Sequence, residues 1–166
     1  VWRAERPQKG RFRQCVQCDI DGLGDGGRTV EAELVAATCE VFLTLGLSGF
    51  EVRCNDRRLL TALAASVGLP PERHAGVFIA LDKLDKLGRD GVLAELTGGG
   101  LSSDAAERLL ALVQPADGRF PSLAEVAAAV GSAPEAALGV AALEDLAAGL
   151  AGVLPPGAVA RFDPSL

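Results

Sequence analysis

The stretch Arg3-Ala4-Glu5-Arg6-Pro7-Gln8-Lys9-Gly10-Arg11-Phe12-Arg13, followed by Gln17-Cys18-Asp19-Ile20-Asp21, carries most of the information about fold and function. The segment from Pro7 to Gly10 joins a residue of fixed φ to a permissive glycine, which favours a loop between two extended arms. From Arg11 to Asp21, apolar and polar residues alternate with a period near two. This alternation predicts a strand that carries Gln17, Asp19 and Asp21 on one face.

Charge is distributed unevenly along the chain. Residues 1–14 carry a net charge of +4, which leaves −10 on the other 152 residues of a chain whose total is −6. This balance argues against a protein that coats nucleic acid generally. Guanidinium groups match phosphate and carboxylate oxygens, and the acids and amides that follow can accept hydrogen bonds from a basic group. A ligand with an anionic end and a basic end would suit the segment, although a solvated basic hairpin beside an acidic strand explains the spacing equally well.

Composition limits the class of protein. The 166 residues are 49% hydrophobic and include 20 Gly, which is enough apolar material for a core and argues against disorder. Four Cys are too few for a disulfide framework, so a reducing, cytoplasmic location is expected. No uninterrupted apolar run has the length of a membrane span, so no membrane association is expected. Because the chain has no Met and no Tyr, we expect a piece of a longer protein rather than a natural start at Val1.

Local signals beyond the hairpin predict mostly helix, with strands at both ends. Short strands are expected at 50–54 and 158–162. The expected helices cover 29–45 with Thr29 as N-cap, a segment from Asn55 or Asp56 to about 67, 70–87, 91–96, a segment from Ser102 or Ser103 to 113, and two Ala-rich helices within 122–152 divided by Pro134. His74 is expected to be a solvated surface residue, and Asp85–Arg89 an i,i+4 ion pair.

The quoted hairpin resembles motif 2 of class II aminoacyl-tRNA synthetases, specifically the histidyl-tRNA synthetases. Further strings agree with that family in order and spacing: Glu31-Ala-Glu33-Leu34, Val52-Arg53-Cys54-Asn55-Asp56-Arg57-Arg58-Leu59-Leu60, Ala80-Leu-Asp82-Lys83-Leu-Asp85-Lys86-Leu-Gly88 and Arg161-Phe162-Asp163-Pro164-Ser165-Leu166. The resemblance implies an α+β fold, part of an antiparallel synthetase sheet with a mostly helical insertion. It divides the chain into a partial catalytic core at 1–55, the helical insertion at 56–157, and a strand returning to the core at 158–166.

The resemblance also implies a role for individual residues of the hairpin. Arg3 matches the catalytic arginine that binds the α-phosphate of ATP and the carboxylate of the amino acid. Glu5 matches the acid that holds the adenine end of ATP, while Arg11 and Arg13 match residues near the triphosphate. Gln8 and Lys9, at the loop tip, would approach the acceptor end of the tRNA. Gln17 and Asp21 match residues that bind the α-amino group and the imidazole ring of histidine.

The implied activity is that of a histidine–tRNA ligase, which joins histidine to tRNA(His) through a histidyl-adenylate. ATP is the implied cosubstrate, with Mg²⁺ held mainly by its phosphates and with no metal site of the protein's own, and the family works as a homodimer. Cys15 departs from the pattern, because the family usually has an aromatic there that stacks on adenine. The sequence has no match to motif 1, motif 3 or the anticodon-binding domain. The segment by itself is therefore expected to be inactive.

Two other interpretations remain open. A synthetase-like paralogue that senses histidine or uncharged tRNA would account for Cys15, although such paralogues tend to lose the phosphate-binding residues. A helical interaction module built on the Ala-rich residues 122–152 would account for the second half of the chain but not for the hairpin. Cys15 and Cys18 lie on a predicted strand, where their side chains would point to opposite faces, so a metal or redox role is disfavoured.

Overall fold

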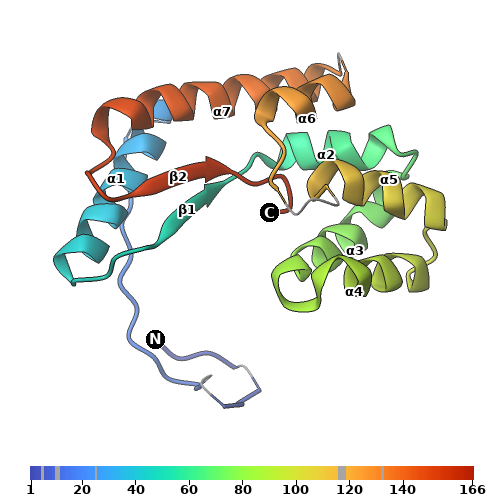
Figure 1. The fold of residues 1–166 in the computed structure, drawn as a ribbon. Helices are drawn as coiled ribbons and strands as arrows, with labels where there is room; N and C mark the ends of the chain where they lie inside the picture. The colour runs from blue at the N-terminus through green and yellow to red at the C-terminus, as the bar shows by residue number, and fades with distance from the viewer. Residues whose placement is uncertain (5, 10–11, 25, 116–118, 132) are drawn as a thin grey trace.

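Helices make up most of this computed structural model, which describes residues 1–166 except 5, 10–11, 25, 116–118 and 132. Figure 1 shows a body of helices, a pair of strands along one side, and an N-terminal segment that projects away from both. In chain order the elements are α1 (Arg28–Thr44), β1 (Glu51–Cys54), α2 (Arg57–Ser66), α3 (Pro71–Leu81), α4 (Leu84–Gly98), α5 (Ser103–Val113), α6 (Leu123–Val130), α7 (Pro134–Val153) and β2 (Val159–Phe162).

The starts of several helices are fixed by local chemistry, as the sequence predicts. The side chain of Asp56 accepts a hydrogen bond from the backbone N–H of Arg58 at 2.8 Å, and that of Ser102 accepts one from Ala105 at 3.2 Å. Pro71 and Pro134 occupy the first helical positions of α3 and α7, where no intrahelical N–H bond is lost. The side chains of Asp56 and Ser102 thus satisfy backbone N–H donors that a helix start otherwise leaves unpaired.

The predicted N-cap of α1 is wrong. The N-cap is Gly27, with extended backbone, and Thr29 already lies inside the helix. Arg28, the first residue of α1, forms an ion pair with Asp145 of α7. The start of this helix therefore takes part in a tertiary contact. A cap prediction from local sequence does not include that contact.

The helix predicted over 70–87 is two helices. α3 ends at Leu81 and α4 begins at Leu84, and both of these leucines are buried. The two helices are divided by a turn at Asp82 and Lys83, and both leucines belong to the main core. α4 then runs through the predicted gap to Gly98, with a kink at Gly88, where φ is 67° and a residue with a Cβ would be strained.

The strands predicted at 50–54 and 158–162 are both present, and the expected mixture of helix and strand is confirmed. β1 and β2 pair in parallel, with Glu51 opposite Val159 and Cys54 opposite Phe162. The resemblance implies an antiparallel sheet, so the parallel pairing is a difference. Between residues 11 and 21 the described residues form no strand. In the N-terminal segment an isolated antiparallel bridge joins Trp2 to Gln14, and no described residue there belongs to a strand.

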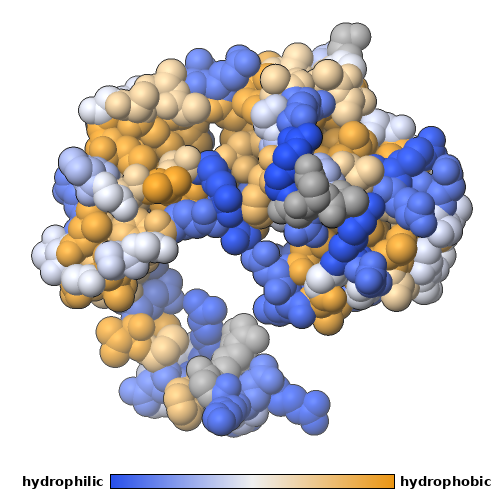
Figure 2. All heavy atoms as spheres, in the orientation of Figure 1, coloured by the Kyte–Doolittle hydropathy of each residue, from blue (hydrophilic) through white to orange (hydrophobic). Residues whose placement is uncertain are grey.

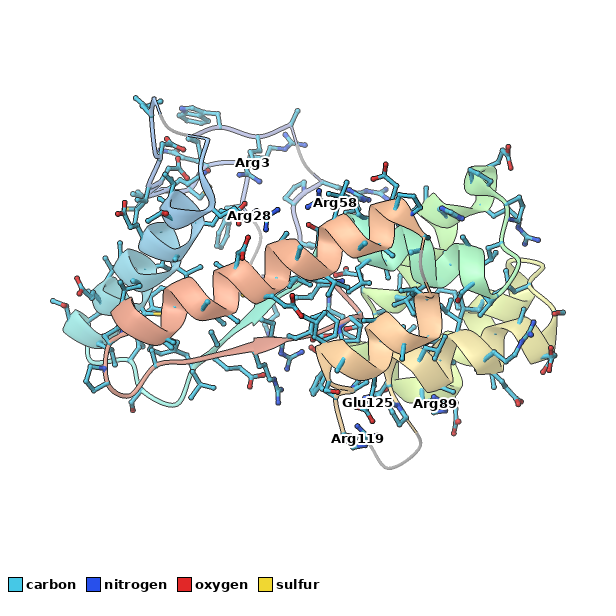
Figure 3. The ribbon with its side chains drawn as sticks, turned by 90° about the horizontal axis from the view of Figure 1, so that it is seen from above. Arg3, Arg28, Arg58, Arg89, Arg119 and Glu125 are labelled. Carbon is cyan, nitrogen blue, oxygen red and sulfur yellow. The ribbon has the colours of Figure 1, made fainter. Side chains whose placement is uncertain are left out.

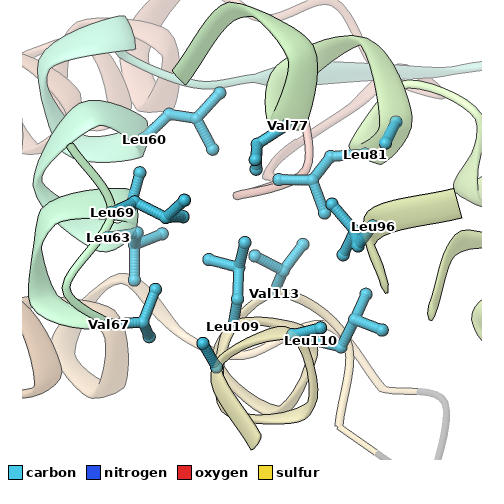
Figure 4. Packing of buried hydrophobic residues seen from close by; sticks show 14 of the residues in the cluster. Leu60, Leu63, Val67, Leu69, Val77, Leu81, Leu96, Leu109, Leu110 and Val113 are labelled. Atoms are coloured by element: carbon cyan, nitrogen blue, oxygen red, sulfur yellow. The ribbon is translucent and has the colours of Figure 1, made fainter. Parts of the chain in front are cut away.

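The main core lies among α2 to α6, with further contributions from α7. Figure 4 shows leucine and valine side chains of α2, α3, α4 and α5 pointing into one space. α7 crosses close to the start of α2, where a Cβ on Gly139 would stand 3.2 Å from the backbone nitrogen of Leu59. α7 also packs on α1, so it joins the segments on either side of β1.

Length and composition would allow α7 to cross a membrane, and among the described residues α7 is the one helix of that kind. Here its inner face, including Ala136, Leu143 and Leu150, is buried against the rest of the protein. It also carries Asp145, which pairs with Arg28. The division into residues 1–55, 56–157 and 158–166 stays a prediction.

Candidate functional site

The two arms of the N-terminal hairpin are joined by backbone hydrogen bonds. The N–H of Arg3 donates to the carbonyl of Arg13 at 2.8 Å, and the N–H of Cys15 donates to the carbonyl of Val1 at 3.1 Å. The terminal ammonium of Val1 donates to the carbonyl of Cys15 at 2.7 Å. The two arms therefore pair over a short stretch, and the predicted loop includes Gly10, which is outside the described residues.

Arg3 and Gln17, to which the resemblance assigns the carboxylate and the α-amino group of histidine, lie in direct contact. The Nη2 of Arg3 donates to the Oε1 of Gln17 at 3.1 Å, and the Nε2 of Gln17 donates to the Oδ1 of Asp19 at 2.6 Å. The last bond joins side chains two residues apart, which agrees with the predicted common face of Gln17 and Asp19. The resemblance implies no role for Asp19, and the sequence pattern predicted only that it could accept a hydrogen bond from a basic group of a ligand. Its position in the alternating pattern was the available signal.

The other predicted site residues that the structure describes lie elsewhere along the N-terminal segment. Gln8 and Lys9 lie at the turn, and they are exposed, as are Arg13 and Asp21. Asp21 stands outside the chain of hydrogen bonds from Arg3 to Asp19, as far as the described residues go. Glu5 and Arg11 are outside the described residues. Figure 3 places Arg3 in the hairpin, on the opposite side of the view from Arg119 and Glu125.

A second polar cluster, which sequence reasoning missed, lies on one face of the strand pair. Glu51 accepts hydrogen bonds from Arg53 Nε at 2.8 Å and from Arg161 Nη2 at 2.6 Å. The Nη1 of Arg53 also donates to Asp85 at 2.8 Å and lies 3.4 Å from Asp163. Asp85 thus pairs with the strand, in place of the predicted i,i+4 contact with Arg89, whose guanidinium donates to the carbonyl of Gln114.

Electrostatics in this cluster follow from the hydrogen bonds. The bond from Arg53 lowers the pKa of Glu51, and Arg161 adds to that effect. The same bond raises the pKa of Arg53. Phe120 packs its ring against both cations, 4.1 Å from the Arg161 guanidinium carbon and 5.4 Å from that of Arg53. Side chains from both strands, α4 and the residues before α6 therefore meet at this face.

The remaining titratable groups do not form a further site. His74 is buried, contrary to its predicted exposure, and its Nε2 lies 3.1 Å from the carbonyl of Leu69. Burial raises the pKa of the Cys39 and Cys54 thiols, which makes them less reactive. Among the described residues no three His, Cys, Asp or Glu side chains converge on a metal position. An apolar groove of about 550 Å³ between α7 and β2, lined by Leu143, Leu150 and Phe162, is separate from the hairpin.

Comparison with known proteins supplies the family context for this geometry. The family model described as histidyl-tRNA synthetase matches residues 1–166. A histidine–tRNA ligase of Leifsonia xyli subsp. xyli is 46% identical over 171 residues, covering 100% of this chain and 39% of that protein. A histidine–tRNA ligase of Aeropyrum pernix is 42% identical over 113 residues, covering 68% of this chain and 26% of its own length.

A solved structure agrees on the fold. The crystal structure of histidyl-tRNA synthetase from Nostoc sp. PCC 7120 superimposes with a TM-score of 0.73 at 20% identity, over 86% of this chain and 34% of that chain. The chain thus spans about two fifths or less of the length of these relatives.

Proposed function

Because the chain belongs to the histidyl-tRNA synthetase family, we propose that it forms part of a histidine–tRNA ligase. The reaction would join the carboxylate of histidine to the α-phosphate of ATP with release of pyrophosphate. The histidyl group would then pass from this adenylate to a terminal hydroxyl of tRNA(His), with release of AMP. The chain spans 39% of its Leifsonia relative, so the activity is that of a longer protein. Residues 1–166 alone would not exchange pyrophosphate.

The contact between Arg3 and Gln17 is the observation that best supports this proposal. In the proposed site Arg3 binds the α-phosphate and the histidine carboxylate, where negative charge builds up as the new bond forms. Gln17 binds the α-amino group, which is attached to the same carbon as that carboxylate. Two groups on one carbon need protein partners that are neighbours, and the 3.1 Å hydrogen bond makes Arg3 and Gln17 neighbours. A fixed guanidinium at that position stabilises the transition state more than the ground state.

The other proposed contacts follow from residue chemistry. Glu5, Arg11 and Arg13 would bind ATP, Gln8 and Lys9 would meet the acceptor end of the tRNA, and Asp21 would accept an imidazole N–H. A carboxylate there would reject amino acids that lack such a donor. Mg²⁺ would neutralise charge on the phosphates. The ion would be held mainly by the phosphates of ATP and by water, because Mg²⁺ keeps much of its hydration shell.

The cellular setting is also a proposal. A homodimer in the cytoplasm, acting on soluble tRNA and without membrane attachment, is the setting that fits the family and the cysteine content. A non-catalytic paralogue that senses histidine or uncharged tRNA is the second candidate. It is favoured by Cys15, an exposed thiol where the family usually places a ring on adenine.

Pyrophosphate exchange tests the proposal. A full-length protein that carries this segment is expected to exchange pyrophosphate with ATP when histidine is present, and Arg3→Ala should lower the rate by a factor of about 10² or more. Arg3→Lys should recover only part of the activity, because an ammonium keeps the charge but not the two-pronged geometry. Arg108→Ala, which removes a cation from the surface of α5, should leave the rate unchanged.

The outcomes separate the two candidates. Histidine-dependent exchange by the unmodified protein would exclude the sensing paralogue. Histidine binding without exchange would favour it and refute the enzyme. Full activity of Arg3→Ala would remove the role assigned to Arg3.

A further inference from the structure

The hydrogen bonds that start at Arg3 end at a carboxylate to which the proposed contacts give no part. Arg3 donates to the Oε1 of Gln17 at 3.1 Å, and the Nε2 of Gln17 donates to the Oδ1 of Asp19 at 2.6 Å. We call these three side chains the polar row. All three residues are exposed, and Figure 2 shows hydrophilic residues over much of the hairpin that carries them. A ligand can therefore reach the polar row from solvent.

The two ends of the polar row fix the orientation of the amide between them. A guanidinium has only hydrogen-bond donors, and a carboxylate has only acceptors. The carboxamide of Gln17 can bind both neighbours only with its oxygen toward Arg3 and its nitrogen toward Asp19, which is the orientation observed. The opposite orientation would set N–H groups against the guanidinium and oxygen against the carboxylate.

This orientation decides whether Gln17 can bind an α-amino group. An ammonium donates hydrogen bonds and accepts none, so it needs the oxygen of the amide. A carbonyl oxygen has two lone pairs, so the Oε1 of Gln17 can accept from Arg3 and from a ligand together. Donation to the charged Asp19 also polarises the amide, which strengthens its oxygen as an acceptor.

We propose that Asp19 is a positioning residue for histidine, which holds the Gln17 carboxamide with its oxygen toward the α-amino group. The inference deepens the proposed function and rests on it, because it concerns the same histidine site. Asp19 contacts Gln17 and acts through it. Asp21, which is proposed to meet the imidazole ring, has no bond to the polar row among the described residues.

Two ligands separate the orientation of the amide from general damage to the hairpin. One is histidine, and the other is 3-(imidazol-4-yl)propanoic acid, which is histidine without its α-amino group. In a full-length protein that carries this segment, Asp19→Ala should weaken the binding of histidine by about tenfold, the effect of losing one charge-assisted hydrogen bond. Binding of the analogue should not change, because the analogue has no ammonium for Gln17 to bind. Isothermal titration calorimetry measures both affinities.

Further variants test whether Asp19 acts through Gln17. Asp19→Asn should lose less than Asp19→Ala, because its side-chain oxygen can still accept from Gln17, without the charge. Gln17→Ala should bind histidine as weakly as the double variant Gln17→Ala/Asp19→Ala, since Asp19 has no amide left to orient. Asp21→Ala should weaken both ligands, and Asp90→Ala, at an exposed position on α4, should weaken neither. In pyrophosphate exchange, Asp19→Ala should raise the KM for histidine and leave the KM for ATP unchanged.

Several results would overturn the proposal. Unchanged histidine binding by Asp19→Ala would do so, as would equal losses for histidine and the analogue, or additive losses in the double variant. The enzymatic proposal fails separately. A protein that binds histidine but exchanges no pyrophosphate refutes the ligase, and the comparison of the two ligands still tests Asp19. An unmodified protein that binds no histidine would overturn both.

Discussion

At the scale of single residues, Arg53 holds the most connected position on the strand pair. Its guanidinium binds Glu51 and Asp85 and lies 3.4 Å from Asp163, whose side chain is 0% exposed. The oxygens of Asp163 also accept hydrogen bonds from the backbone N–H and the hydroxyl of Ser165, at 2.9 and 2.6 Å. Arg53→Gln leaves a buried carboxylate without its cation, and we expect the free energy of unfolding to fall by about 1–3 kcal/mol. Urea denaturation measures it.

Arg108, an arginine in a solvent-exposed ion pair, provides the control for Arg53. Arg108 forms an exposed i,i+4 pair with Asp104 at 3.2 Å, so Arg108→Gln should cost no more than about 0.5 kcal/mol. Equal losses for the two variants would contradict the importance assigned to burial of Asp163.

At the scale of elements, α6 depends on its capping box, because 8 residues are too few for a stable isolated helix. Ser122 and Glu125 exchange hydrogen bonds, and Arg119 donates two more to the Glu125 carboxylate at 2.9 and 2.7 Å. The bonds from Arg119, then those from Ser122, lower the pKa of Glu125 from 4.5 to about 2. A depressed pKa in the folded state contributes stability above the unfolded pKa, which is lost as pH falls from about 4.5 toward 2.

We therefore expect Glu125→Gln to destabilise the protein at pH 7, and the deficit should shrink as pH falls through this window. Urea denaturation across the pH range measures the difference from the unmodified chain. Glu144→Gln, an exposed acid on α7, controls for the loss of one surface charge. A deficit that stays constant from pH 7 to about pH 3 would rule out the carboxylate as its source.

At the scale of the whole molecule, stability is concentrated in the helical core, and the hairpin contributes little to it. Leu59, Leu63, Leu109 and Leu110 are fully buried, whereas every described residue from 1 to 24 is exposed. Amide hydrogen exchange should therefore be slowest in α2 and α5 and fast throughout the first 24 residues. Strong protection of the hairpin would show that it packs on the body.

Local signals were reliable wherever a short segment determines its own conformation. Asp56 and Ser102 cap helices, and Pro134 separates α6 from α7, because each effect operates within a few residues. The strand at Glu51–Cys54 and its return partner were also predicted. The roles assigned to Arg3 and Gln17 came from the family resemblance. The spacing of the residues alone is explained equally well by a solvated hairpin without a ligand.

The sequence alone determined the mixture of helix and strand, most helix boundaries and the family, because caps, prolines and ordered motifs are local. Only the tertiary structure decided the parallel register of the strands, the turn between α3 and α4, the burial of His74 and the ion pairs of Arg53. Each of these depends on residues far apart in the chain. Asp85 pairs with Arg53, 32 residues away, instead of the Arg89 that helical spacing suggests. Asp85 reaches Arg53 because α4 packs beside the strand pair, and the spacing of residues along the sequence does not predict that packing.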